Sequence, residues 1–518
     1  MITLSPIISE LIKDLDTSVA QTSSPKVNVS TIGSSAGSLY ERLRNVIDYK
    51  DEHLLRRNAI ERILKRKLLF PNGDSIGEGL IKELIWGQYI KNDSIPYSMA
   101  SVIDVVVEKY KRLFGFKQEN VKEDEGKKWL IGLMSVEVDR LLVSQILEEA
   151  LNRAMYRWIE SKIRFPSEVN DKEKQVQTFI AVRKSLFKED IPTVRYNLLL
   201  TYIPSWGKAD IKLTEKFSEN FSKIYQEIEG SLKNPLNTKL TKFFQPFTPP
   251  FLIVRDLILK FDLVKLLEDP DELDYQIERT CEKKYLLTRN KLGRSIFRST
   301  VYIFLTKMLL AYVLEMPADL YLYNKVHLTP LAINIIFPPV LMYMIGSSIK
   351  APRKENTEII KKLINEICYE SSKNQTEVPG IYEARNVFLG RLFWVLYVIG
   401  FVLSYGFIVY ILNRLHFGLA SGALFLFFLS VVSFFAYRIR LTAREYMVIG
   451  QREGIISGII DFFIIPFLRM GQWLSIEFSK INIFMFVFDF IIEAPFKAFI
   501  EIAEEWIGFL RQKKEEII

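Results

Sequence analysis

Leu389–Leu412 is LGRLFWVLYVIGFVLSYGFIVYIL and Phe417–Tyr437 is FGLASGALFLFFLSVVSFFAY, and these two stretches decide the fold class. A helix needs about 20 apolar residues to cross the roughly 30 Å hydrocarbon core of a bilayer. Both stretches meet that requirement, and Arg298–Met316 and Leu328–Ser348 meet it with a few polar interruptions. The sequence therefore predicts an all-α, polytopic membrane protein with four spans arranged as two hairpins.

Lysine and arginine residues around the four predicted spans fall almost entirely on one side, which sets the orientation of a membrane protein. The two short hairpin loops hold only Lys325 and Arg414. The segments before the first span, between the second and third, and after the fourth are rich in cations. Met1–Asp16 lacks the cationic start and unbroken apolar core of a cleavable signal peptide. We therefore predict a multi-pass protein of the cell (plasma or inner) membrane with both termini in the cytoplasm.

Apolar residues before the first span recur at helical spacing, and no segment alternates apolar and polar residues as a half-buried strand does. Asp74 or Ser75 is placed to cap one of these helices, and Asp269 to cap a later one. The region is thus predicted to be a large cytoplasmic all-α domain. Its main predicted helices are Tyr40–Leu69, Ile76–Ile90, Gly126–Phe165, Asp171–Phe187, Thr193–Tyr202 and Thr214–Leu232.

Composition divides the chain into five predicted parts. The first is a short amphipathic helix followed by a linker rich in Ser and Thr. A proline-marked boundary, FQPFTPP, closes the second. The parts are residues 1–38 (helix and linker), 39–250 (cytoplasmic all-α domain), 251–294 (helical connector), 295–437 (four-span domain with a cytoplasmic helical loop at 350–388) and 438–518 (amphipathic interfacial helices).

Composition also argues against several kinds of site. From Met1 to Arg294 the 47 Lys and Arg residues exceed the 42 Asp and Glu by only five, too dilute an excess for nucleic-acid binding. Cys281 and Cys368 both fall on the predicted cytoplasmic side, so we expect two free thiols. The three histidines have no partner at metal-ligand spacing, and no Gly-rich phosphate-binding loop is present. We predict no cofactor, no metal and no nameable catalytic residue.

Lys307 lies inside the first predicted span, about 14 Å beyond Arg298 at 1.5 Å per residue. An ammonium near the bilayer centre costs roughly 2.5 kcal/mol or more and normally faces a partner or a watery cavity. Glu315 and Asp319, two and three turns later, are the nearest acids, and the three form a candidate intramembrane polar site. The preferred alternative is a span shifted toward Tyr323, in which Lys307 extends its ammonium to the cytoplasmic headgroups.

The second predicted span contains Pro330, Pro338 and Pro339, and the last two are expected to kink it. Broken helices of this kind bind substrates in transporters. Neighbouring helices also repair proline breaks in ordinary membrane proteins. Because the third and fourth spans hold no Asp, Glu or Lys, a substrate path has little support from the sequence.

Two further groups of charged residues are predicted to lie at the membrane surface. Cations before the first span can contact anionic headgroups, at about 1 kcal/mol each, or serve only as a topology signal. They are Lys283, Lys284, Arg289, Lys291 and Arg294. The C-terminal segments Gly454–Ile476 and Ile481–Leu510 carry a narrow polar stripe, which predicts helices lying in the interface or, alternatively, two more spans. The stripe consists of Asp461, Asp489, Glu493, Lys497, Glu501 and Glu505.

Three functions are compatible with these features. The first, and the preferred one, is a membrane-anchored scaffold that contacts membrane lipids and binds a protein partner through its helical cytoplasmic domain. A homo-oligomer is compatible with this function and with the next. The second is a transporter or channel subunit that uses Lys307 and the proline-kinked second span. The third is an enzyme acting on lipid at the interface, which needs Asp461, Asp489 and Glu493 to be catalytic.

Overall fold

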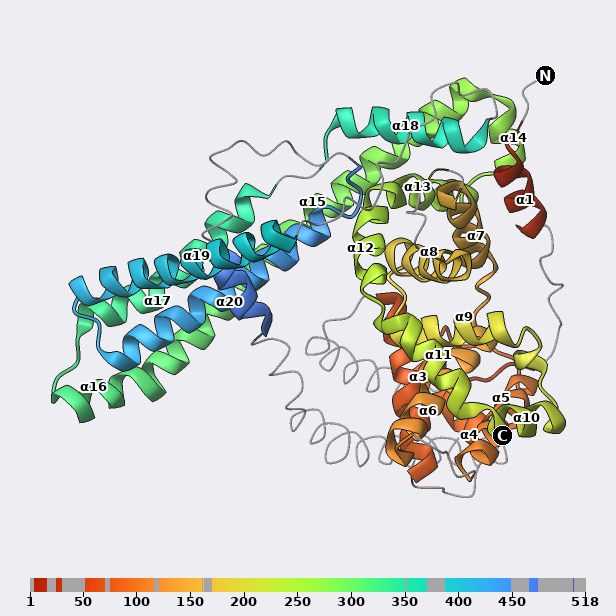
Figure 1. Ribbon diagram of the computed structural model, residues 1–518, viewed down its shortest axis with the longest axis horizontal. Coiled ribbons are helices and arrows are strands. Elements are labelled where there is room, and N and C mark those ends of the chain that lie inside the picture. The colour runs from red at the N-terminus through yellow and green to blue at the C-terminus, as the bar shows by residue number, and fades with distance from the viewer. Residues whose placement is uncertain are drawn as a thin grey trace, which may run out of the picture. The chain divides into compact units, whose positions relative to one another are not determined.

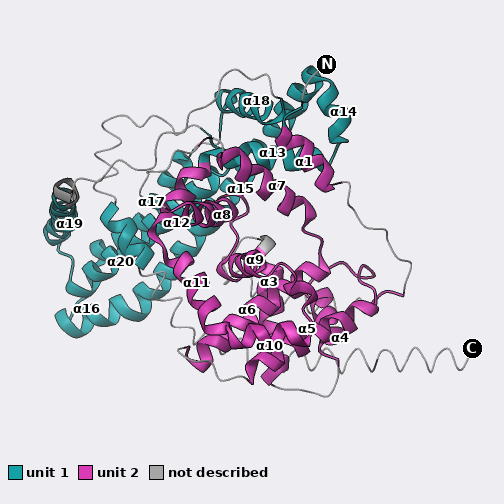
Figure 2. Cartoon of the chain, turned by 45° about the vertical axis from the view of Figure 1, so that its right-hand side comes forward, with its two compact units in different colours: residues 1–5, 246–482 teal, residues 6–245, 483–518 magenta. Residues whose placement is uncertain are grey.

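The computed structural model describes residues 4–15, 25–29, 52–69, 75–115, 121–160, 162, 170–349, 352–369, 387–448, 465–473 and 506. The chain divides into two compact units (Figure 1; Figure 2). Unit 1 comprises residues 1–5 and 246–482, and unit 2 comprises residues 6–245 and 483–518. The described residues form helices and, apart from two isolated β-bridges, no strand. The predicted all-α class is confirmed for them.

Unit 2 is built from short helices that pack on their neighbours in sequence and on one another. Helices α3, α5 and α9 all pack against α6, and α8 packs against α7 and α12. The helices are α1 (Pro6–Leu15), α3 (Glu52–Leu69), α4 (Ile76–Trp86), α5 (Ser98–Phe114), α6 (Glu123–Leu142), α7 (Ile146–Glu160), α8 (Asp171–Leu186), α9 (Ile191–Tyr202), α10 (Ile211–Glu219), α11 (Phe221–Lys233) and α12 (Pro235–Phe244), with a 3₁₀ turn η1 (Trp206–Lys208).

Side-chain caps fix the first residue of several of these helices, because a cap satisfies backbone N–H groups that have no partner inside the helix. The Ser75 hydroxyl accepts a hydrogen bond from the backbone N–H of Glu78. Ser75 is therefore the cap of α4, and it is one of the two residues predicted for that role. Asp190 and Asp210 accept backbone N–H groups in the same way at the starts of α9 and α10.

Two of the predicted helices are interrupted in unit 2. The periodic segment Gly126–Phe165 contains both α6 and α7, because Val143 leaves the helical conformation at φ −137° and ψ 123°. Such an extended backbone suits a β-branched residue. Thr214–Leu232 is divided at Asn220, whose side-chain amide donates to the carbonyl of Lys216. Side-chain bonds to the backbone compete with the helix in this way.

Large aromatic side chains fill the core of unit 2. Trp129, Trp206, Tyr110 and Phe217 are all buried almost completely. The rings of Tyr110 and Trp206 meet edge to face with 6.0 Å between centroids, a favourable geometry for two aromatic quadrupoles.

Unit 1 contains four helices that are long and apolar enough to cross a membrane: Pro270–Tyr323, Leu328–Ser348, Trp394–Arg414 and Leu419–Ala443. The sequence prediction of four such segments is thereby confirmed by length and composition. The elements of unit 1 are α13 (Thr248–Ile258), α14 (Leu263–Glu268), α15 (Pro270–Leu310), the π-helical turn η3 (Ala311–Glu315), α16 (Met316–Tyr323), α17 (Leu328–Ser348), α18 (Lys354–Cys368), α19 (Val387–Arg414) and α20 (Leu419–Ala443), with a 3₁₀ turn η2 (Gln245–Phe247) at the junction of the units.

Helix α15, η3 and α16 form one continuous helical segment of 54 residues. The connector and the first span, predicted as separate helices, are joined in it. Asp269 caps its start, as predicted, by accepting the backbone N–H groups of Asp271 and Glu272. Pro317 explains the π-helical turn, because proline removes a backbone donor and crowds the carbonyl four residues earlier. The chain widens into η3 (Ala311–Glu315) directly before it.

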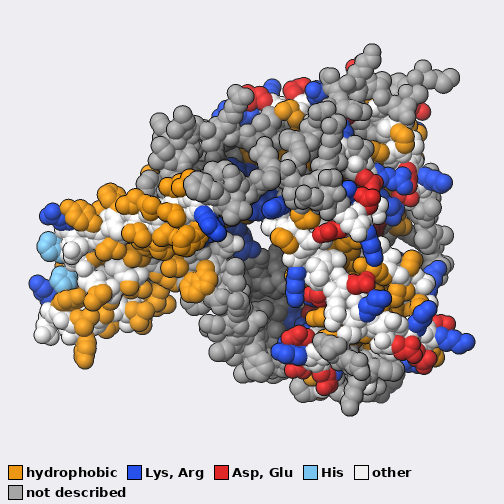
Figure 3. All heavy atoms as spheres, viewed as in Figure 1, with side chains coloured by type: hydrophobic (Ala, Val, Ile, Leu, Met, Phe, Trp, Pro, Cys, Tyr) orange, Lys and Arg blue, Asp and Glu red, His pale blue; other side chains and the backbone are white. Residues whose placement is uncertain are grey.

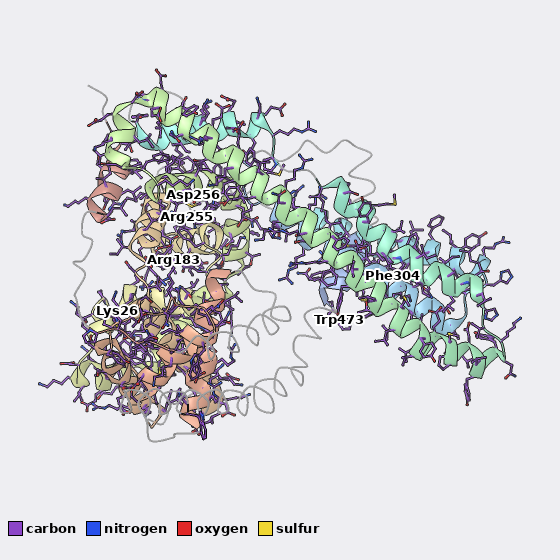
Figure 4. All side chains as sticks on the ribbon, turned by 180° about the vertical axis from the view of Figure 1, so that it is seen from behind. Lys26, Arg183, Arg255, Asp256, Phe304 and Trp473 are labelled. Carbon is purple, nitrogen blue, oxygen red and sulfur yellow. The ribbon has the colours of Figure 1, made fainter. Side chains whose placement is uncertain are left out.

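Apolar side chains cover the outside of the four long helices. Within the most apolar stretch of each of these helices, only 17 to 39% is buried inside the protein. Exposed examples on α15 include Leu305 (58%) and Phe304 (40%), which is labelled in Figure 4. Figure 3 shows hydrophobic side chains over most of the visible face of this helix group. Such a surface is suited to contact with lipid tails and not with water.

The inward faces of α15, α17 and α20 pack on one another around a small apolar core. Ile303 and Met342 are fully buried in this core, and Val432 meets them from α20. At Gly346 helix α17 packs closely on α15, since a Cβ added to Gly346 would lie 2.8 Å from the Ile296 side chain. Small residues allow such close packing between membrane helices.

Candidate functional site: a buried polar cluster

Lys307 is completely buried within unit 1, on the inward face of α15. Its ammonium Nζ lies 3.9 Å from Oε2 of Glu315 and 4.7 Å from the centre of the Phe428 ring. The cation therefore faces an acid and an aromatic ring inside the helix group. Its buried side chain differs from the preferred sequence interpretation, in which the ammonium reaches the headgroups.

Glu315 ends the π-helical turn and is joined to α17 and, through Asn334, to α20. Its Oε1 accepts a hydrogen bond of 2.7 Å from the amide of Asn334 in α17. The same amide donates to the backbone carbonyl of Ser421 in α20 at 3.0 Å. Sequence reasoning named Glu315 but missed Asn334 and Ser421. An asparagine in an otherwise apolar span is the signal that points to the first of them.

Asp319 lies one turn beyond Glu315, next to the turn that links α16 to α17. Its Oδ2 accepts a backbone hydrogen bond from His327 at 3.2 Å and lies 3.3 Å from Nδ1 of the same residue. The turn before α20 also contacts this place, because a Cβ added to Gly418 would lie 3.3 Å from Oδ1 of Asp319 and 2.9 Å from the ring of Tyr323. The two hairpin turns therefore meet beside Asp319.

Five buried polar atoms of this polar cluster have no hydrogen-bond partner among the described residues. They are Nζ of Lys307, Oε2 of Glu315, Oδ1 of Asp319, Oδ1 of Asn334 and Oγ of Ser421. Each such atom costs on the order of 1–3 kcal/mol when it stays unsatisfied. A group of orphan donors and acceptors inside an apolar helix group is able to exchange protons or hold a small polar ligand.

Backbone irregularities lie beside the same residues. The π-helical turn ends at Glu315 itself, and π-turns inside helices are frequent at functional sites. In α17, the predicted Pro338 and Pro339 lie buried inside the helix, one turn beyond Asn334. Near Lys307 and Glu315, both helical segments therefore depart from regular α-helical backbone hydrogen bonding.

The five juxtamembrane cations have different environments in α15. Lys284 is bound by Asp256 of α13, with Nζ and Oδ2 2.5 Å apart (Figure 4 labels Asp256). The other four, Lys283, Arg289, Lys291 and Arg294, are exposed. Arg289 also lines a cavity of about 820 Å³. Lys284 is thus occupied within the protein, whereas the remaining four are accessible.

The C-terminal polar stripe lies outside the described residues. This applies to Asp461, Asp489, Glu493, Lys497, Glu501 and Glu505. Within the described part of the chain, no group of three or more His, Cys, Asp or Glu side chains is arranged to hold a metal ion. Cys281 and Cys368 are free and buried, and burial raises the pKa of the Cys368 thiol to about 12. Neither cysteine is therefore a ready nucleophile.

No protein-family model, no curated protein and no solved structure matches this chain.

Proposed function

We propose that this chain is an integral membrane protein whose four long helices cross the bilayer as two hairpins, with both termini in the cytoplasm. The exposed apolar surface of unit 1 and the one-sided distribution of lysine and arginine support this placement. Under this orientation, Asp319 and His327 lie near the outer face. Lys307 and Glu315 lie within the hydrocarbon layer.

Substituted cysteines test the topology. Native Cys281 and Cys368 are only 0% and 1% exposed, so neither is expected to react from either side. A cysteine at Asn324 or His416, in a background without the native thiols, is expected to react with a membrane-impermeant reagent added to intact cells. One at Lys354 is the matched inside control. Reaction at Lys354 before cell lysis would contradict the proposed orientation.

Within this membrane protein, we propose that the buried polar cluster moves protons. The observation that carries the proposal is the Lys307–Glu315 pair, wholly buried, 3.9 Å apart and without a hydrogen bond between its charged atoms. Ionisable residues inside membrane helices are costly and commonly mark ion pathways and proton relays. Here His327, Asp319, Glu315 and Lys307 follow one another from the hairpin turn toward the interior.

The proton steps balance over one cycle. A proton from the outer water reaches Glu315 by way of His327 or Asp319 and neutralises the Glu315 carboxylate. The Lys307 ammonium then has no counter-charge in an apolar setting and releases its own proton toward the opposite side. Transfer of the Glu315 proton to Lys307 restores the charged pair, so one proton has crossed. The irregular turn at Ala311–Glu315 gives α15 the freedom to change which side Lys307 faces.

Proton flux into proteoliposomes tests the relay. The purified full chain is reconstituted with a pH-sensitive dye inside the vesicles, and a potassium diffusion potential drives uptake. Lys307→Met and Glu315→Gln are each expected to abolish flux above the background of empty vesicles. Lys325→Gln removes an exposed cation in the first hairpin loop and is expected to keep it. Equal flux in the wild type and in Lys307→Met would refute the relay.

A membrane-anchored scaffold is the second candidate function. Helix α5 of unit 2 exposes Val102 (43%) and Val105 (70%), two apolar residues one turn apart. This pair is the feature of α5 that supports a contact surface, and it is too small by itself to identify one. Crosslinking of the full chain in its native membrane tests this candidate, and Val105→Lys is expected to remove the crosslinked product if α5 binds a partner or a second copy.

The third candidate, a lipid-acting enzyme, depends on Asp461, Asp489 and Glu493, which lie outside the described residues.

A further inference from the structure

A cavity of about 820 Å³ lies where α15, the end of α17 and the start of α18 come together in unit 1. Its volume is typical of pockets that bind small molecules. Two arginines line it. Arg289 belongs to α15, and Arg353 is the residue directly before α18. Among the described lining residues Glu282 is the only acid, so the cavity carries a net positive charge.

The two guanidinium groups are exposed and not engaged elsewhere. No ion pair or hydrogen bond is formed by the Arg289 or Arg353 side chain within the described residues. Nearby Lys284 is different, because Asp256 holds it at 2.5 Å. A planar guanidinium is well suited to phosphate oxygens, which it can bind through two parallel N–H groups.

Apart from the three charged residues and from Tyr285 and Ser347, the cavity is lined by apolar residues and glycines. Leu292 and Ile296 of α15 line it together with Ile349 at the end of α17. Leu286, 61% exposed, extends this wall to the outside. Gly346 and Ile296 also line the cavity, and they pack closely, since a Cβ added to Gly346 would lie 2.8 Å from the Ile296 side chain. The cavity thus has a cationic rim and an apolar wall that continues into the surface of the predicted spans.

The position of Arg353 is fixed by hydrogen bonds that join α18 to α15. The amide of Asn356 and the hydroxyl of Thr357, both in the first turn of α18, donate to the hydroxyl of Tyr285 at 2.9 and 3.2 Å. Tyr285 itself lines the cavity. The two arginines therefore flank the cavity on a supported framework and not on two independent surface segments.

We propose that this cavity binds an anionic phospholipid, with Arg289 and Arg353 on its phosphate and the apolar wall along the first part of an acyl chain. A lipid fits better than free phosphate, because half of the lining would remain unused by a small ion. The proposal rests on the membrane placement of unit 1 and is independent of the proton relay. The cavity lies at the end of the spans that is predicted to face the cytoplasm.

Native mass spectrometry of the full chain in neutral detergent tests the proposal with phosphatidylglycerol and phosphatidylcholine of identical acyl chains. The Arg289→Gln/Arg353→Gln double variant is expected to weaken phosphatidylglycerol binding about 30-fold, at about 1 kcal/mol per cation. The control double variant Lys283→Gln/Lys291→Gln removes the same charge from exposed positions on α15 outside the cavity. In neutral detergent these two lysines face no extended anionic lipid surface and do not line the cavity, so the control is expected to change binding less than about twofold.

A cavity-filling variant separates shape from charge. Gly293 lines the cavity and a Cβ added there meets no atom within 4 Å, so Gly293→Leu is expected to fold and to narrow the cavity. It is expected to weaken phosphatidylglycerol binding while every arginine remains. Equal weakening by the two double variants, or equal binding of the two lipids, would overturn the proposal. Displacement of phosphatidylglycerol by millimolar inorganic phosphate would assign the site to free phosphate and would overturn the assignment to a phospholipid. Each result leaves proton flux unaffected, so failure here is distinct from failure of the relay.

Discussion

In the described parts of the chain, each unit contains a buried lysine beside a buried glutamate, and the two pairs are built differently. In unit 2, Lys109 lies 2.5 Å from Glu137 and also donates to the carbonyl of Trp206 at 3.1 Å. Glu137 in turn accepts the hydroxyl of Tyr110 at 2.9 Å. In unit 1, Nζ of Lys307 and Oε2 of Glu315 are 3.9 Å apart, and neither of these two atoms has a hydrogen-bond partner among the described residues, although Oε1 of Glu315 accepts a hydrogen bond from Asn334.

The difference separates a structural ion pair from one that can change its protonation state. Satisfied buried charges hold helices in one arrangement, and removal of one partner is strongly destabilising. Unsatisfied buried charges add little stability and are retained where they serve another purpose. The pair in unit 2 therefore fits a fixed core, whereas the pair in unit 1 fits proton exchange.

Substitution of Lys109 is expected to have the largest effect. Lys109→Met leaves Glu137 buried without its cation and is expected to destabilise unit 2 by about 3–5 kcal/mol. Hydrogen exchange of the α5 and α6 amides in the full chain measures this loss. Lys111→Met, which removes an exposed partner of Glu108, is the control and is expected to cost under about 1 kcal/mol. Similar losses in both variants would show that burial of the pair does not matter.

Crowding of the two hairpin turns is expected to have the next largest effect. Gly418→Leu forces a side chain against Tyr323, whose ring atom would lie 2.9 Å from the new Cβ. Overpacking of this kind costs about 1–3 kcal/mol, so the midpoint of thermal unfolding in detergent is expected to fall. Gly422→Ala meets open space and is the matched control. It is expected to be neutral or to stabilise α20 by up to about 1 kcal/mol.

Substitution of Lys307 is expected to cost far less stability than that of Lys109. Lys307→Met gives up no hydrogen bond, and Glu315 keeps its bond from Asn334. The free energy of unfolding is therefore expected to fall by less than in Lys109→Met, although proton flux is lost. Hydrogen exchange in α15 and α17 measures the stability. A loss as large as that of Lys109→Met would make Lys307–Glu315 a structural pair and end the contrast between the units.

The smallest expected effect is on the pH dependence of stability. Burial lowers the pKa of Lys109 from its ordinary 10.5, although Glu137 opposes this shift. The unfolded chain then binds more protons than the folded one just below pH 10.5, so the contribution of Lys109 to stability rises with pH there. Stability of the wild type relative to Lys109→Met is expected to increase as the pH approaches 10.5, as hydrogen exchange in α5 would detect. A constant difference over this range would contradict a lowered pKa.

Helical periodicity and cap residues were sufficient to predict most of the helices, since both depend on local sequence. Asp171–Leu186 differs from its predicted range by one residue, and Asp269 caps α15 as expected. Breaks inside periodic segments were not predicted. At Val143 and Asn220 the apolar repeat continues through the break, so periodicity alone gives no signal that the helix ends.

The candidate site was predicted only in part. Lys307 was recognisable because a cation in an apolar span is costly wherever it points. Its surroundings were not, because Asn334, Ser421 and Phe428 come from helices 27 to 121 residues further along the chain than Lys307. The lipid cavity shows the same limit, since Arg353 was counted only as a loop cation and Arg289 only as one of five juxtamembrane charges.

The amino-acid sequence by itself determined the helical class, the four apolar segments and their charge asymmetry, because hydropathy and helix propensity act over a few turns of chain. Tertiary structure alone decided which cations are satisfied. Lys284 is bound by Asp256, Arg289 faces a cavity, and Lys307 is buried beside an acid that it does not reach closely enough for a hydrogen bond. A charge acts over a few ångströms, so its role depends on which distant segments packing brings within that range.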